Sequence, residues 1–309
     1  MHGPALQRLA SLSKVSLEVI CDMRIERAQA FSNLFGYRAA SADLQGALRT
    51  ARPDAIVCTV QPPATASLVQ SLLPLGVPLL IEKPPGVSLT EAVSLAQVAK
   101  ATGCFAFVAF NRRHIPHIVR LKQWAERNTV RHARVEMLRT NRLEPYFAVE
   151  TGIHALDAVR YLLGNPVAMQ VRSQSHEPTS AQDRWFTMTF ANDSVAEVAM
   201  MLNTGLRRES YMLFAEGATA EAALGSAYSS DLSFQGDRIW QREEIVQQQS
   251  LTGDPLIDGG IMGEYEEFIR LIQAGLLSTC SLEDAAYSMQ LAEAVQSGYS
   301  GTLPPLFVD

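Results

Sequence analysis

The sequence predicts an α/β fold: a doubly wound parallel (Rossmann-type) sheet followed by an α+β domain with a large antiparallel sheet. Three observations support this class. The chain has 309 residues, which at about 150 residues per domain suggests two domains. Wholly apolar runs alternate with helical patterns in the first third, as in parallel sheets covered on both faces. Later runs follow one another without intervening helices, which predicts antiparallel strands.

The elements predicted before residue 110 alternate regularly. The strands are expected at 15–21, 37–40, 55–60, 77–81 and 105–110. The helices are expected at 5–12, 24–35, 44–49, 68–75 and 89–100. Gly36, Gly76 and Gly103 stand where three of these helices stop. The right-handed crossover rule then predicts a sheet of the doubly wound, nucleotide-binding type.

After Asn111 the predicted strands and helices no longer alternate regularly. A helix at 116–127 leads into a strand at 132–140, and a helix at 153–163 follows. Strands are predicted at 167–173, 184–191, 195–202, 211–216 and 233–240, with a hairpin turn at Asn192-Asp193. Two helices, 263–274 and 282–296, close the chain. We therefore predict a dinucleotide-binding domain over 1–110 and a substrate-binding and oligomerisation domain over 111–309.

Composition narrows the function classes. The net charge of −6 argues against a general binder of nucleic acid or of anionic membranes. No apolar run approaches the roughly 20 residues that span a bilayer, and the N-terminus lacks the apolar stretch of a signal peptide. The four cysteines are scattered, as buried free thiols in a reducing compartment would be. A soluble, cytoplasmic protein is expected.

The N-terminus departs from this fold class, because the chain opens with a predicted helix rather than a strand. The turn G-x-G-x-x-G, which cradles a pyrophosphate, is absent. Loss of a central first strand would leave two neighbouring strands with unpaired backbone groups. Either Met1 is an internal methionine of a longer chain, which we favour, or the sheet has closed around the gap.

Lys83 stands out because only four residues of the chain are lysines. It follows a buried parallel strand, at the end where open α/β sheets bind ligands. A partly desolvated lysine there can act as an acid or base, or can bind a substrate hydroxyl. A surface lysine paired with Glu82 is an equally good interpretation of its position alone.

His154 falls in the first turn of a predicted helix. Asp157 follows at i+3, close enough to orient the imidazole, and Glu150 is a second possible acid or base. Taken alone, the segment is better explained by a capping acid and a satisfied histidine. The pair His114 and His117 lacks an evident third ligand, so we expect no metal site there.

These segments together resemble the Gfo/Idh/MocA oxidoreductases, NAD(P)-dependent enzymes that act mostly on sugars, inositols and related polyols. The resemblance covers nearly the whole chain. Its segments are Val19-Ile20-Cys21-Asp22, Pro62-Pro63-Ala64-Thr65, Glu82-Lys83-Pro84, Phe110-Asn111-Arg112-Arg113 and Gly152-Ile153-His154-Ala155-Leu156-Asp157.

The resemblance implies roles for these residues. Lys83 would contact the reacting hydroxyl and the cofactor, and His154 would accept the hydroxyl proton. Asp22 would bind the adenosine ribose, which favours NAD over NADP. The remaining cofactor-binding positions implied are Thr59, Pro62, Glu82, Asn111 and Arg113. A homo-oligomer, a dimer or tetramer, is also implied, because exposed sheet faces commonly pair in this family.

The sequence also departs from the family pattern. The glycine-rich turn is missing, Glu150 replaces a frequent aspartate, and Ala66 replaces a frequent histidine. Our first hypothesis is an oxidoreductase in which His154 takes the proton, Lys83 polarises the oxygen, and Glu150 or Asp157 tunes His154. The alternative is a non-catalytic scaffold or sensor that has lost dinucleotide binding.

Overall fold

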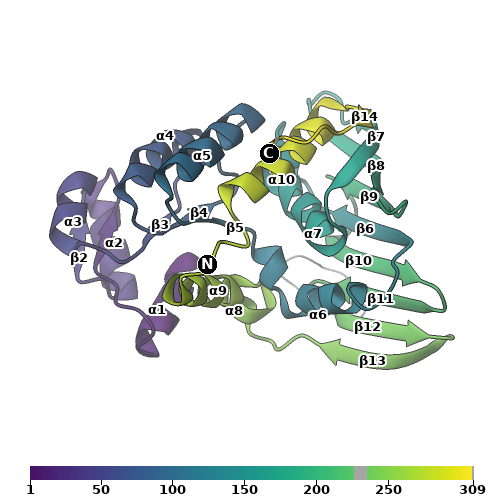
Figure 1. Cartoon of the computed structure of the whole chain (residues 1–309), viewed down its shortest axis with the longest axis horizontal. Coiled ribbons are helices and arrows are strands. Elements are labelled where there is room, and N and C mark those ends of the chain that lie inside the picture. The colour runs from purple at the N-terminus through teal and green to yellow at the C-terminus, as the bar shows by residue number, and fades with distance from the viewer. Residues whose placement is uncertain (226–234, 308–309) are drawn as a thin grey trace.

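The computed structural model describes residues 1–225 and 235–307, and they form two regions joined by a common core (Figure 1). In the first region short parallel strands alternate with helices. The strands are β1 (Val19–Cys21), β2 (Ala39–Ser41), β3 (Ile56–Cys58), β4 (Leu79–Glu82) and β5 (Ala106–Ala109). The helices are α1 (His2–Ser11), α2 (Ile25–Phe35), α3 (Leu44–Ala51), α4 (Pro62–Leu72) and α5 (Leu89–Thr102), with a 3-10 turn η1 (Leu73–Leu75).

The parallel strands of this region lie in two separate sheets. β1 pairs with β2, and β3, β4 and β5 form the second sheet in that order. β1 and β3 are not hydrogen-bonded to each other. The alternative in which the sheet closes around the gap is therefore wrong, and a break separates the two sheets where a doubly wound fold has a central strand.

Local sequence explains where these helices begin and end. The Asp43 side chain accepts a hydrogen bond from the Gly46 N–H and caps α3. Ser88 caps α5 through the Glu91 N–H, while the Glu91 carboxylate accepts from the Val87 N–H at 2.8 Å. Gly103 ends α5 with a φ of +64°, a conformation that glycine adopts without strain.

The second region is a nine-stranded sheet with helices on one face. The strand order is β13-β12-β11-β10-β6-β9-β8-β7-β14. The strands are β6 (His132–Leu138), β7 (Pro166–Ser175), β8 (Gln182–Phe190), β9 (Val195–Met201), β10 (Arg208–Ala215), β11 (Ala218–Ala223), β12 (Gly236–Gln241), β13 (Glu244–Ser250) and β14 (Gly301–Thr302). The remaining elements are η2 (Asn111–His114), α6 (Pro116–Ala125), the π-turn η3 (Ala148–Gly152), α7 (Ile153–Leu163), α8 (Pro255–Asp258), α9 (Ile261–Ala274) and α10 (Leu282–Ser297).

The expectation of an antiparallel sheet is correct for all but one pair of strands. β6 and β9 run parallel, with His132 opposite Val195. The reason is that the chain leaves β6 through α7, builds the β7–β8 and β8–β9 hairpins, and then returns beside β6 in the same direction. The predicted turn at Asn192-Asp193 does join β8 to β9. Part of the strand predicted at 233–240 lies outside the described residues.

The two regions share their cores through the end of the chain. α9 lies beside α1 (Figure 1), and Phe268 of α9 is buried in one cluster with Leu9, Leu80 and Phe107. α10 packs against both α5 and α7. The C-terminal helices therefore fix the parallel strands of the first region against the large sheet. Within the described residues, no helix is long and apolar enough to cross a bilayer.

Candidate active site

Four of the predicted site residues follow the carboxyl ends of parallel strands. Asp22 follows β1, Thr59 follows β3, Lys83 follows β4 and Asn111 follows β5. Ligands bind at this edge in open α/β sheets. The Asp22 carboxylate accepts from the Arg24 N–H at 2.8 Å, which shapes the turn before α2. Thr59 is exposed there.

Pro62 and Glu82 have structural neighbours at the same edge. Pro62 begins α4, where its missing N–H is no loss. Glu82 binds His2 Nε2 through Oε1 at 2.5 Å, and its Oε2 accepts from the Lys83 N–H at 2.9 Å. His2 Nδ1 in turn lies 2.8 Å from the Tyr265 hydroxyl. Glu82 thus ties α1 and α9 to the end of β4.

The Lys83 ammonium reaches across to the second region. Its Nζ donates to the backbone carbonyl of Glu150 at 2.6 Å. Burial lowers the pKa of Lys83; the nearby Glu82 charge opposes that shift and the Arg112 charge adds to it. The surface pairing with Glu82 that we weighed for Lys83 is wrong, because no ion pair joins them in the described chain.

His154 stands in the first turn of α7, and its Nδ1 is buried without a hydrogen-bond partner among the described residues. Burial lowers the pKa of His154 well below 6.5, and the positive charges of Arg112, Lys83 and Arg139 lower it further. The imidazole is therefore neutral near pH 7. Lys83 Nζ bonds to the carbonyl of Glu150, four residues before His154, so the ammonium lies near the start of the helix that carries the imidazole.

A buried ionic network adjoins this pair, and sequence reasoning missed it. Glu209 of β10 binds Arg112 through both oxygens, at 3.1 and 3.2 Å, and also binds Arg139. The Tyr211 hydroxyl donates to Glu209 at 3.0 Å. These cations lower the pKa of Glu209 to about 2 despite its burial. The one available signal was a charged pair, Arg208-Glu209, at the start of an otherwise uncharged strand.

The expectation that Asp157 orients His154 is wrong. Asp157 is fully buried, and its two oxygens accept from Arg113 at 2.8 and 2.6 Å. The Ser288 hydroxyl donates to it as well, at 2.8 Å. A guanidinium fork satisfies a buried carboxylate better than an imidazole one turn away, which is why Asp157 turns to Arg113. No hydrogen bond joins Asp157 to His154 in the described chain.

Arg113 and Asn111 are structural hubs in this fold. Arg113 also binds Asp284 at 2.6 Å and the Thr279 carbonyl at 3.1 Å, so it joins α7 to α10. Asn111 is buried and donates to the Gly259 carbonyl at 2.8 Å. Gly260, with a φ of +76°, lies so close that an added Cβ would sit 2.1 Å from the Asn111 carbonyl oxygen. The predicted contacts of Asn111 and Arg113 with a cofactor remain predictions.

Glu150 contributes differently from the expectation. Its side chain is exposed, and the atom that contacts Lys83 is the backbone carbonyl. This carbonyl lies in the π-turn η3, where the regular α-helical bonding is interrupted. A position that uses its carbonyl tolerates either glutamate or aspartate, which accounts for the departure at this residue.

The two other histidines named by the sequence have different surroundings. His117 Nδ1 lies 2.6 Å from Asp237 Oδ1. His114 is half-buried, its Nε2 has no hydrogen-bond partner among the described residues, and its pKa is lowered to about 4 by burial and by the Arg113 charge. Among the described residues, no group of three or more acidic, histidine or cysteine side chains is placed to hold a metal ion. The four cysteines are free.

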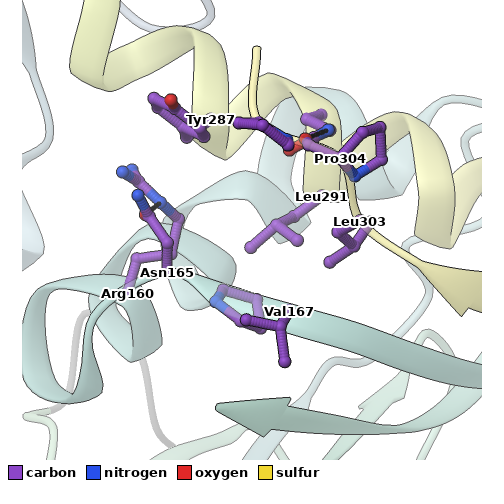
Figure 2. A pocket seen from close by; sticks show the side chains of 10 residues that line it. Arg160, Asn165, Val167, Tyr287, Leu291, Leu303 and Pro304 are labelled. Carbon is purple, nitrogen blue, oxygen red and sulfur yellow. Dashed lines mark hydrogen bonds between the residues drawn. The ribbon is translucent and has the colours of Figure 1, made fainter. Parts of the chain in front are cut away.

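A cavity of about 210 Å³ lies between α7, β7, α10 and the C-terminal segment (Figure 2). Arg160, Asn165 and Tyr287 line one side of it, and Val167, Leu291 and Leu303 line another. The Arg160 guanidinium is already bound to Asn165, Ser288 and Asp284. None of the candidate site residues lines this cavity.

The fold and site define a class: a nucleotide-binding α/β region whose strand-end lysine meets a histidine from a large sheet region. Two family models match the chain, the oxidoreductase family NAD-binding Rossmann fold over residues 1–110 and the oxidoreductase family C-terminal alpha/beta domain over residues 144–301. The second match alone covers half of the chain. The chain belongs to the Gfo/Idh/MocA oxidoreductase family.

Individual relatives are distant. The chain is 26% identical over 186 residues to D-glucoside 3-dehydrogenase of Escherichia coli (strain K12), a match to 54% of this chain and 52% of that protein. The alignment thus spans about half the length of that curated relative.

Solved structures confirm the fold. A myo-inositol dehydrogenase from Corynebacterium glutamicum ATCC 13032 superposes with a TM-score of 0.80 at 18% identity, covering 98% of this chain and 96% of that one. UDP-N-acetylglucosamine 3-dehydrogenase GnnA from Acidithiobacillus ferrooxidans gives 0.81 at 20% identity, covering 96% and 93%. At such identities these likenesses establish the architecture and not the substrate.

Proposed function

We propose that the protein is an NAD(P)-dependent oxidoreductase that moves a hydride between a nicotinamide and a hydroxyl-bearing carbon of a sugar, inositol or related polyol. The observation that carries this proposal is the 2.6 Å bond from Lys83 Nζ to the Glu150 carbonyl, which holds the strand-end lysine about one turn before His154 although the two residues belong to different regions. The family supports it, as do the relatives that act on a glucoside, an inositol and a nucleotide sugar.

The described residues fit a dinucleotide in part. Asp22 follows β1 with a half-exposed carboxylate, and Thr59 and Pro62 follow β3 on the same edge. An acid after the second strand of this fold binds ribose hydroxyls, which favours NAD over NADP. The glycine-rich turn for the pyrophosphate is not part of residues 1–309. When bound, the nicotinamide supplies the hydride acceptor or donor.

The chain's own residues would handle the proton. In oxidation, the neutral imidazole of His154 takes the hydroxyl proton, because its lowered pKa keeps it unprotonated near pH 7. Lys83, held by the Glu150 carbonyl, donates a hydrogen bond to the same oxygen and stabilises its negative charge. Asp157 acts indirectly, since its bonds to Arg113 and Ser288 fix α7, which carries His154.

Two further features belong to this proposal. We place the enzyme in the cytoplasm, because its four cysteines remain free, as thiols do in a reducing compartment. We also propose a homo-oligomer, a dimer or tetramer, formed through the large sheet. Its support is the exposed apolar pair Ile245 and Val246 on β13, an edge strand of that sheet.

The test is NAD+ reduction with a panel of sugars, inositols and polyols. We expect at least one substrate to be oxidised, and Lys83→Met and His154→Asn each to lower kcat/KM by about 10²- to 10⁴-fold. Lys14→Met, at an exposed lysine paired with Glu266, is the matched control and should leave the rate unchanged. A folded chain that binds neither NADH nor any panel member would support the non-catalytic alternative instead.

A further inference from the structure

The groups around His154 are mainly cationic. Lys83 lies on one side, and Arg112 and Arg139 supply two further positive charges that act on the imidazole. Arg142 stands next to them, because its Nη2 donates to the Thr151 hydroxyl at 2.9 Å, one residue beyond the carbonyl that holds Lys83. The charges of Lys83, Arg112 and Arg139 thus act on His154, and the charge of Arg142 acts on Lys83.

Carboxylates compensate part of this charge, since Glu144 is paired with Arg142, and the charges of Glu82 and Glu150 act on Lys83. Glu209 is shared, since it accepts from Arg139 as well as from Arg112. Lys83 bonds to a neutral carbonyl, and no carboxylate lies within ion-pair distance of its Nζ in residues 1–225 and 235–307. The network around Asp157 is different, because Asp157 and Asp284 together face Arg113 and Arg160 with equal numbers of charges.

One of these four cationic side chains, Arg142, reaches the surface. The Arg142 side chain is 41% exposed. Its loop lies against the loop after β9: the Arg142 N–H donates to the Leu202 carbonyl at 2.9 Å, and the Thr204 N–H donates to the Arg139 carbonyl at 2.8 Å. Arg207 follows in that second loop, and its pKa is lowered by burial and by the charges of Arg139 and Arg142. Positively charged side chains thus extend from the buried Arg112 and Arg139 to Arg142 at the surface.

From this arrangement we infer that the substrate is an acidic sugar or polyol derivative, whose carboxylate or phosphate is bound by Arg142 while a hydroxyl reaches Lys83 and His154. Nε and Nη2 of Arg142 are bound to Glu144 and Thr151, so an oxyanion would be bound through Nη1 in a charge-assisted hydrogen bond. Arg142 is a specificity residue in this scheme. Its bond to Thr151 and its ion pair with Glu144 hold it in place beside Lys83. The inference rests on the proposed function and deepens it by naming the substrate class.

The test compares ligands that differ only in charge. D-gluconate and D-glucitol share a six-carbon polyol chain, but one ends in a carboxylate and the other in a hydroxymethyl group. By isothermal titration calorimetry of the full chain, gluconate should bind at least about tenfold more tightly than glucitol. D-glucuronate with D-glucose is a second pair, and glucitol 6-phosphate separates a phosphate from a carboxylate preference.

Variants locate the effect. Arg142→Gln should lower the affinity for gluconate much more than that for glucitol and so remove most of the gluconate advantage, because glucitol has no anionic group for the guanidinium to bind. Arg131→Gln, at an exposed arginine paired with Glu216, is the control and should keep the wild-type preference. Equal affinity for the two members of both pairs, or no binding by any acid, would overturn the inference.

The same ligands separate this inference from the proposed function. Oxidation of glucitol or glucose with no preference for the acids would keep the oxidoreductase and refute the acidic substrate. Tight binding of gluconate without any NAD+ reduction across the panel would refute the oxidoreductase while the anion site stands.

Discussion

Two glutamates of this protein are fully buried, and their surroundings are opposite. Glu209, beside the candidate active site, is bound by two guanidiniums and a tyrosine hydroxyl, and its pKa is lowered to about 2. Glu264, near the start of α9, has no hydrogen-bond partner for either oxygen among the described residues. Burial and the nearby Glu82 charge raise its pKa well above the usual 4.5. Glu209 is therefore ionised near neutral pH, whereas Glu264 keeps its proton to a higher pH than an ordinary glutamate.

The two glutamates mark one region whose buried charges have hydrogen-bond partners and another in which a buried carboxyl has none. The second region holds its charges in bonded networks, which fix Arg112, Arg139 and α7 around His154. The region around α9 and β4 leaves a buried acid unbonded, in the same part of the molecule where the parallel strands lie in two separate sheets. Burial alone thus says little about a carboxylate, because its partners decide both its charge and its effect on stability.

The largest effect is expected for Glu209→Gln. The amide cannot neutralise Arg112 and Arg139, which would remain buried, so the free energy of unfolding should fall by about 3–5 kcal/mol. Urea unfolding measures this. Glu216→Gln, at an exposed ion pair with Arg131, is the control and should change stability by about 0.5 kcal/mol or less. If the two variants were equally stable, the Glu209 network would not hold this region together.

A smaller effect of opposite sign is expected for Glu264→Met. The variant removes an unbonded buried carboxyl and keeps an apolar side chain of similar length, so stability at neutral pH should rise by about 1–3 kcal/mol. The sign follows from the raised pKa. In the wild type the protonated Glu264 contributes stability below pH 4.5, and that contribution is lost as pH rises towards the folded pKa.

The gain from Glu264→Met should therefore be larger at pH 8 than at pH 4. Thermal unfolding at the two pH values provides the measurement, with Glu266→Met at an exposed position of the same helix as the control. A variant that is less stable than the wild type at pH 8 would show that Glu264 has a partner that the geometry lacks.

The smallest change in stability is expected for Tyr211→Phe, which alters one neutral partner of Glu209. Tyr211→Phe removes the hydroxyl that donates to Glu209 at 3.0 Å but leaves both guanidiniums in place. The expected loss of stability is about 1 kcal/mol, since Glu209 keeps its charged partners. A loss as large as that of Glu209→Gln would mean that Tyr211, rather than the arginines, stabilises the carboxylate.

Much of the fold could be predicted from periodicity. The apolar runs before residue 110 became β1 to β5, although the observed strands are shorter than the runs that predicted them. β11 and β13 were missed. The first is built from alanine, threonine and one glutamate, and the second carries three consecutive glutamines, so neither has the β-branched or aromatic pattern that marks a strand.

The site was predictable only where local position carried information. Lys83 was found because it ends a buried strand, and His154 because it begins a helix and matches a family motif. The partners of Asp157 and Arg112 could not be found in this way. Glu209 lies 97 residues from Arg112 along the chain, and Arg113 lies 44 from Asp157, so no spacing rule connects them. Such pairs depend on how helices and sheet pack against each other.

The central claim is that Lys83 and His154 act on each other across the two regions. Titration of the His154 imidazole by nuclear magnetic resonance, in the wild type and in Lys83→Met, tests it without any cofactor. We predict that the wild-type imidazole protonates well below pH 6.5 and that its pKa rises when the Lys83 charge is removed. An ordinary pKa near 6.5 that does not respond to Lys83→Met would contradict the account.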